Sequence, residues 1–275
     1  MRRCYLLFMT LMLVCIGCEW HLSGSGKPSE PAVVVERYDR IQSLYLTTGD
    51  FSALQQMNTS YPQQTRMLIE DVLRIGQVNE PEINVKFLNF FQDTTLQELI
   101  AASEQEFASM ADIDRDFSDA FVRLQQLLPG IAVPQIYAQI GSLDQSIIVG
   151  NGILGISLDK YLGSNYPLYL RESYGYTPEQ RSMMTRQYIV PDCIGFYLLS
   201  LYPMPFDREL SQLERDIHIG KVQWVVNQAL DRTIFNTLYT RNVGHYMKSH
   251  PDVSVDQMLK TSNLFKTTSR KNTET

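Results

Sequence analysis

The chain has 275 residues, a net charge of −6 at neutral pH and a hydrophobic content of 44%. This composition supports one large domain or two small ones with a real core, and it excludes bulk disorder. The acidic balance argues against nucleic acid as a partner and against electrostatic adhesion to an anionic membrane.

The N-terminus has the plan of a lipoprotein signal peptide. Two arginines precede an uncharged apolar run at residues 5–16, which is shorter than the roughly 20 residues of a membrane-spanning helix. The run ends in Cys15-Ile-Gly-Cys18, which resembles a bacterial lipobox with Cys15 where Leu is usual. We therefore predict that residues 1–17 are removed, that Cys18 carries the acyl chains (palmitate), and that residues 18–31 are a flexible tether. The alternative is an ordinary signal peptide with an incidental cysteine.

Cysteine and histidine spacing predicts neither a disulfide nor a metal site. After processing, Cys193 is the one cysteine left besides Cys18, so no intramolecular disulfide forms. No two histidines lie four positions apart with a Glu between them, as a helical zinc site requires. The acidic run 112–116 lacks the Gly and distal Glu of an EF-hand loop and is interpreted as a solvated helix junction. No metal and no cofactor are expected.

Helical periodicity dominates the first half of the chain. An extended segment or short strand begins at Val33, and a short helix follows it up to Leu46. Thr95-x-x-Glu98 matches a capping box and predicts Thr95 as the N-cap of a long helix. Further helices are predicted over residues 51–57, 62–75, 83–91 and 116–128.

The residues from 131 to 158 are typical of β-strands. Pro134 makes the stretch 131–140 an edge-strand candidate. Asn151-Gly152 lies between two apolar runs, which is a strong hairpin signal. Together these stretches predict a small antiparallel or mixed sheet of three or four strands.

The same stretch matches a nucleotide-binding motif. Gly150-x-Gly152-x-x-Gly155 has the spacing of the dinucleotide-binding fingerprint, which must be followed by a helix. Here a strand-like run follows the first two glycines and contains the third, so we interpret the motif as a hairpin turn and expect no bound nucleotide.

Helical signals return after residue 163. Thr177-Pro178-Glu-Gln180 predicts a helix with Thr177 as N-cap, Pro178 at N1 and Gln180 at N3. Further helices are predicted over residues 190–201, 208–230, 232–248 and 253–259, and a disordered tail over residues 267–275.

Ser157, Asp159 and Lys160 form the best polar cluster near the predicted sheet. A catalytic role competes with a simpler one, in which Asp159 ends the strand and caps the next turn while Lys160 is solvated. Four tyrosines follow that either line a groove or pack in the core with their hydroxyls at the rim, namely Tyr166, Tyr169, Tyr174 and Tyr176. A Gly-x-Ser-x-Gly nucleophile elbow is absent from the sequence.

Several short motifs occur in a fixed order. They are Ile156-Ser-Leu-Asp159-Lys-Tyr-Leu-Gly163, Tyr166-Pro167, Tyr188-Ile-Val-Pro-Asp192 and Ile219-Gly220-Lys221. With the lipobox, this series resembles the GldB family, the gliding motility-associated lipoproteins of Bacteroidota. Relative to that family, the segment 222–245 is short.

The resemblance implies a GldB-like domain over residues 32–266. It implies an α+β fold, mostly helical with one small sheet, that is distantly similar to zinc peptidases of the His-Glu-x-x-His type (zincins). The helix that follows the sheet lacks both histidines, so a zincin-like fold would have no metal site.

The resemblance also implies a non-enzymatic protein of the cell envelope. We expect it to be lipid-anchored to the inner or outer membrane and to bind other envelope or motility-machinery proteins. The candidate functional surface is Asp159, Lys160, Tyr161 and Asp192. The alternative is a degenerate or unrecognised peptidase-like hydrolase with a site near Asp159 and Lys160.

Overall fold

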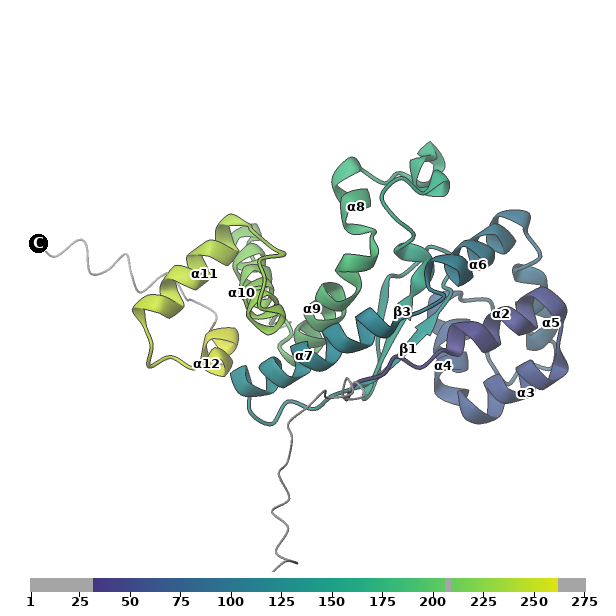
Figure 1. Ribbon diagram of the computed structural model, residues 1–275, viewed down its shortest axis with the longest axis horizontal. Coiled ribbons are helices and arrows are strands. Elements are labelled where there is room, and N and C mark those ends of the chain that lie inside the picture. The colour runs from purple at the N-terminus through teal and green to yellow at the C-terminus, as the bar shows by residue number, and fades with distance from the viewer. Residues whose placement is uncertain (1–31, 206–208, 262–275) are drawn as a thin grey trace, which may run out of the picture. The chain divides into compact units, whose positions relative to one another are not determined.

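The computed structural model describes residues 32–205 and 209–261. The predicted signal peptide, Cys18, the tether and the tail 267–275 lie outside the described residues. The predicted fold class is confirmed, because the described chain is mostly helical and contains one three-stranded sheet (Figure 1).

Most of the chain from residue 38 to residue 127 is helical, as predicted. They are α2 (Tyr38–Thr48), α3 (Phe51–Ser60), α4 (Pro62–Arg66), a π-helix (Met67–Val72), α5 (Ile83–Phe90), α6 (Thr94–Glu106) and α7 (Ala111–Leu127). Three boundaries differ from the prediction by three residues or more. Helix α3 extends to Ser60, three residues past its predicted end. The helix expected to reach residue 75 ends at Val72, just before Arg74 takes a left-handed φ of 53°. Helix α7 begins at Ala111 and so includes the acidic run in its first turns.

The predicted N-cap of α6 is wrong. Asp93, two residues before Thr95, caps this helix: its Oδ1 accepts hydrogen bonds from the backbone amides of Thr95 (2.8 Å) and Leu96 (3.3 Å). An aspartate at this position also places a negative charge at the positive end of the helix. The capping-box pattern therefore begins two residues inside the helix.

The sheet contains β1 (Gln135–Gln139), β2 (Ile147–Val149) and β3 (Ile153–Ser157) in the order β1-β3-β2. Strands β2 and β3 form the predicted antiparallel hairpin, with Gly152 at a φ of 75° in its turn. Strand β1 lies parallel to β3 at the sheet edge, so the sheet is mixed and the edge position predicted from Pro134 is confirmed.

Gly155 serves close packing inside the sheet. Tyr137 lies opposite it on β1, and a Cβ on residue 155 would lie 2.6 Å from the Tyr137 ring. The glycine is therefore required by a neighbouring side chain, in line with the hairpin interpretation of the motif.

Helices cover both faces of the sheet (Figure 1). On one face, Ile136, Leu154 and Ile156 pack with apolar residues of α7 and of two later helices, α9 (Ile189–Leu201) and α10 (Gln212–Leu230). On the other face, Tyr137 and Ile148 pack with residues of α2, α3 and α5. Strand β3 and helix α9 thus contact each other in the same part of the core.

The second half of the chain is also helical. A connection of short 3₁₀ turns, including Leu158–Lys160, leads to α8 (Pro178–Met183), and the chain continues through α9 and α10 to α11 (Leu238–Ser249) and α12 (Val255–Lys260). The capping box of α8 at Thr177 and Gln180 is confirmed.

Two predicted helix starts are wrong. Helix α10 begins at Gln212, after a capping box formed by Ser211 and Glu214. Helix α11 begins at Leu238, six residues later than expected, because the Asn227 side chain binds the intervening loop. Its Oδ1 accepts from the amides of Ile234 (2.9 Å) and Phe235 (3.0 Å). These bonds hold the loop in a non-helical course.

Candidate functional site

Three of the four candidate surface residues line one small pocket. Lys160 ends the 3₁₀ turn after β3, Tyr161 follows it, and Asp192 lies in the first turn of α9. The pocket has a volume of about 170 Å³. Its lining comprises Ser146, Lys160, Tyr161, Tyr176, Gln180, Met183, Met184 and Asp192. We call it the Asp192 pocket.

Asp159 does not line the pocket and is fully buried. Its Oδ1 accepts a hydrogen bond from the amide of Gly141 (2.7 Å) and its Oδ2 accepts one from the amide of Leu143 (2.5 Å). Burial raises the pKa of the Asp159 carboxyl, and the two amides oppose that shift. Asp159 therefore anchors the loop 141–143, rather than capping the next turn as the simpler interpretation had it.

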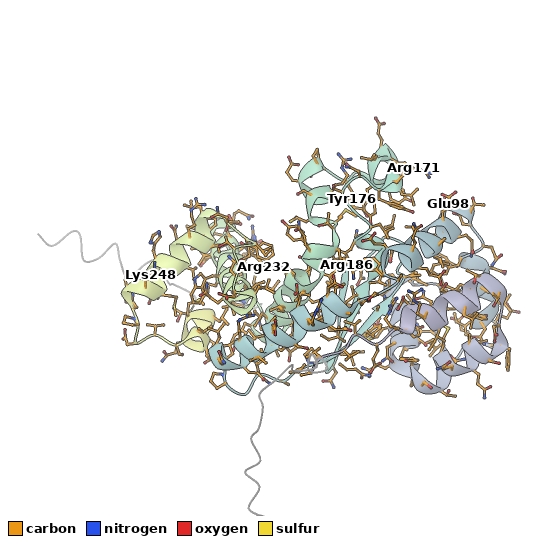
Figure 2. All side chains as sticks on the ribbon, viewed as in Figure 1. Glu98, Arg171, Tyr176, Arg186, Arg232 and Lys248 are labelled. Atoms are coloured by element: carbon orange, nitrogen blue, oxygen red, sulfur yellow. The ribbon has the colours of Figure 1, made fainter. Side chains whose placement is uncertain are left out.

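Lys160 is held at the pocket rim. Its Nζ donates hydrogen bonds to the Tyr176 hydroxyl (2.8 Å) and the Leu143 carbonyl (3.2 Å), and it lies 4.6 Å from the centre of the Tyr176 ring. Figure 2 labels Tyr176, which reaches this position from the connection before α8. The expectation of a freely solvated Lys160 is wrong, because a cation-π contact and two hydrogen bonds hold its ammonium group.

Two residues of the pocket lining, Tyr161 and Asp192, are joined by a hydrogen bond. The Tyr161 hydroxyl donates to Oδ2 of Asp192 at 2.8 Å. Burial raises the pKa of Asp192 to about 6, although the Tyr161 hydrogen bond works in the opposite direction. Oδ1 of Asp192 receives no hydrogen bond from the described residues. The pocket thus offers a carboxylate oxygen that can accept a hydrogen bond or face a cation.

The four tyrosines of the connection pack on one another. Tyr166 and Tyr176 each contact the ring of Tyr169 edge-on, at centroid distances of 5.1 and 5.9 Å, and Tyr174 stacks on Tyr176. Tyr169 is buried, and its hydroxyl donates to the backbone carbonyl of Asp159. Within this group, Tyr176 lines the Asp192 pocket. Mutual packing describes the group better than a groove lined by all four, but the Tyr169 hydroxyl is buried and does not lie at a rim.

An apolar groove adjoins the pocket, and sequence reasoning missed it. It has a volume of about 220 Å³, runs between α9 and α10, and shares Met183 and Asp192 with the pocket. Three residues of α9 line it, Pro191, Gly195 and Leu199. Their four-residue spacing places them on one face of the helix, and this spacing could be read from the sequence. Phe196, also in the lining, keeps 44% of its surface exposed. We call it the α9–α10 groove.

The pocket does not present an activated nucleophile. Ser146 lines it together with Lys160, but the hydrogen bonds of Lys160 go to Leu143 and Tyr176. In the part of the chain that the structure describes, no group of three or more His, Cys, Asp or Glu side chains is placed to hold a metal ion. Cys193, next to Asp192, is fully buried, and burial raises the pKa of its thiol well above the ordinary value.

The chain is thus a mostly helical α+β domain with a polar pocket and an apolar groove at the junction of its sheet and α9. A family model described as gliding motility protein GldB matches residues 25–239, most of the chain. The protein therefore belongs to the GldB family and is associated with gliding motility, as the sequence motifs predicted. The match includes the pocket and the groove and ends in the first turn of α11.

Two further comparisons complete this picture. No curated protein and no solved structure matches the chain at a significant level. The likeness to zincins therefore stays a prediction. Across residues 32–205 and 209–261, none of the helices combines the length and the apolar character that crossing a bilayer requires.

Proposed function

We propose that this protein is a lipid-anchored component of the cell envelope that contributes to gliding by binding another protein of the motility machinery. Its binding surface is the Asp192 pocket together with the α9–α10 groove. Membership of the GldB family supports the role in gliding, and the Cys15-Ile-Gly-Cys18 motif supports the anchor. The anchor attaches the domain to the inner or outer membrane through acyl chains on Cys18.

The observation that carries the binding role is the continuity of the two cavities. The polar pocket and the apolar groove meet at Met183 and Asp192, so one bound segment can engage both. The groove accepts an apolar side chain beside Phe196. The unpaired Oδ1 of Asp192 then meets a hydrogen-bond donor or a cationic group of the same segment.

The alternative, a hydrolase near Asp159 and Lys160, has weaker support. Both carboxylate oxygens of Asp159 are bound to backbone amides inside the core. A general base must reach the proton that it abstracts, and a buried carboxylate with both oxygens bound to amides does not. The pKa of about 6 for Asp192 is compatible with acid-base chemistry. Even so, the described pocket lacks an activated nucleophile beside it.

A gliding assay tests the binding surface. The chain is expressed in a gliding bacterium that lacks its own GldB-family gene, with Phe196→Glu as the test variant. A charge in the groove must be desolvated when an apolar side chain enters, so we expect gliding to be lost while the protein level stays normal. The matched control is Val85→Glu on α5, since Val85 is 59% exposed and lies on the other side of the sheet. Equal gliding by both variants would refute the surface.

The anchor has its own test, independent of the groove. Cys18→Ala is expected to abolish metabolic labelling with palmitate and to release the protein from membranes. Cys4→Ala is the control, because it removes a cysteine that lies outside the Cys15-Ile-Gly-Cys18 motif and leaves the acceptor in place. Labelling that survives in Cys18→Ala would show that Cys18 is not the acylated residue.

A further inference from the structure

Another cavity lies away from the Asp192 pocket and shares no lining residue with it. It is a groove of about 530 Å³ between α10 and α11, and residues of the turn that follows α11 also line it. Its lining comprises Trp224, Gln228, Arg241, Gly244, His245, Met247, Lys248, Pro251 and Val253. We call it the α10–α11 groove. Apart from Trp224 and Gln228, these residues lie beyond the match to the GldB family model.

The α10–α11 groove is basic, unlike the chain as a whole. Arg241, His245 and Lys248 are spaced four and three residues apart on α11, so they share one face of that helix. None of the three forms an ion pair with any residue that the structure describes. The lining contains no Asp or Glu, although the chain carries a net charge of −6. Lys248, labelled in Figure 2, lies in the last turn of α11 and is exposed.

Arg241 is positioned by a neighbouring loop. Its Nη1 donates to the backbone carbonyl (3.0 Å) and the side-chain Oδ1 (3.1 Å) of Asn236. These two bonds use one nitrogen of the guanidinium and leave the rest of its planar fork available to a carboxylate.

An aromatic side chain forms part of the groove wall. The indole of Trp224 lies against the backbone of α11 at Gly244, where an added Cβ would be 3.2 Å from Nε1. Met247, Pro251 and Val253 continue the apolar lining. The groove therefore combines a row of cations with an apolar wall, and a ligand that fits both carries negative charge and some apolar surface.

We propose that the α10–α11 groove binds an acidic, extended peptide segment of a partner protein. Seven residues of helix span about 10.5 Å between Arg241 and Lys248. An extended chain rises about 3.3 Å per residue and places every second side chain on one face, so acidic side chains four residues apart, about 13 Å, lie on one face and reach both ends of the row. The cations line a concavity. A single chain can enter it, whereas the plane of a membrane contacts protruding side chains instead.

The test measures binding of fluorescein-labelled hexaglutamate to the full-length protein in neutral detergent by fluorescence anisotropy. We expect saturable binding that weakens as salt is added, and no binding of labelled hexaglutamine. The double variant Arg241→Glu with Lys248→Glu should weaken binding at least about tenfold, because it removes two attractions and adds two repulsions. Arg171→Glu with Arg115→Glu is the matched control. It makes the same charge change at two exposed arginines outside the groove, of which Arg171 is labelled in Figure 2.

Three results would overturn the proposal. They are the absence of hexaglutamate binding, binding that the double variant leaves unchanged, and binding of phosphatidylglycerol vesicles without binding of the peptide. The last result would assign the groove to the membrane surface. Circular dichroism checks that each variant is folded. If the double variant unfolds, Lys248→Gln replaces it, since Lys248 is exposed and a change there leaves the core intact. The assay involves neither Phe196 nor Cys18, so its outcome is independent of the proposed function.

Discussion

Tyr161 and Asp192 are 31 residues apart in the sequence and are joined by a hydrogen bond of 2.8 Å from the tyrosine hydroxyl to Oδ2 of the carboxylate. The bond ties the turn after β3 to the first turn of α9 and joins two residues that line the pocket. It also supplies one of the few favourable interactions of a carboxylate whose pKa burial raises to about 6. The first two predictions concern this pair.

Removing the donor should raise the pKa of Asp192 further. Tyr161→Phe deletes the hydroxyl and leaves a mostly buried carboxylate without its hydrogen bond, so we expect a pKa above 6 and a loss of about 1–3 kcal/mol of stability. A carboxyl-detected NMR titration and urea unfolding measure the two effects. Tyr174→Phe is the control, since its ring stacks on Tyr176 and none of the hydrogen bonds among the described residues involves its hydroxyl. An unchanged Asp192 pKa in Tyr161→Phe would contradict the assignment.

Asp192 should make stability depend on pH between about 4 and 6. Its pKa is raised in the folded state from 3.8 to about 6, so in this range the folded chain binds more protons than the unfolded chain. Stability contributed by this group therefore falls as pH rises through the window, by about 2–3 kcal/mol, and stays constant above it. Urea unfolding of Asp192→Asn should show the variant gaining that amount relative to the wild type from pH 4 to pH 7. A constant difference across the window would refute the raised pKa.

Asp159 should prove structural. In Asp159→Asn one acceptor oxygen is replaced by an NH₂ group that faces a backbone N–H of the loop 141–143. We expect a loss of about 1–3 kcal/mol in urea unfolding, with gliding retained at permissive temperature. Asp144→Asn, an exposed change next to the same loop, should stay within about 0.5 kcal/mol of the wild type. Full stability of Asp159→Asn combined with loss of gliding would instead favour a catalytic role.

Gly220 should be required where α10 meets α11. A Cβ at this position would lie 2.5 Å from Cβ of Tyr239 and 2.9 Å from its backbone carbon, so Gly220→Ala should cost about 1–3 kcal/mol. Gly195 also lies within a helix, but its nearest neighbour to an added Cβ is 4.0 Å away. Gly195→Ala should therefore be neutral or stabilising by up to about 1 kcal/mol. Thermal unfolding of both variants decides this, and equal effects would contradict the close approach of the helices.

Local signals in the sequence predicted local structure well. The capping box at Thr177 and the Asn151-Gly152 turn specify their own geometry within a few residues, and both are confirmed. The start of α11 was missed because Asn227, in the preceding helix, binds the loop at Ile234. Hydrophobic periodicity, from which the helix was predicted, carries no information about such a side-chain bond to a loop.

The candidate site was predicted in part. Sequence motifs pointed to Lys160, Tyr161 and Asp192, and the fold brings them to one pocket because β3 ends beside α9. The burial of Asp159 could not be predicted, because its hydrogen-bond partners are backbone amides of a loop and leave no mark in the sequence. The spacing of Arg241 and Lys248 in the sequence already places both on one face of α11. That this face lines a groove could not be predicted, because only the tertiary structure places Trp224 of α10 beside it.

Photo-crosslinking at the junction of the pocket and the groove tests the central claim most directly. A p-benzoylphenylalanine at Met183, which is 41% exposed and lines both cavities, is placed in the protein expressed in gliding cells. We predict a discrete adduct with a protein of the motility machinery that is absent when Phe196→Glu is added and when the photo-reactive residue replaces Val85 instead. The absence of any adduct at position 183, or the same adducts from both positions, would contradict a partner-binding surface at Asp192.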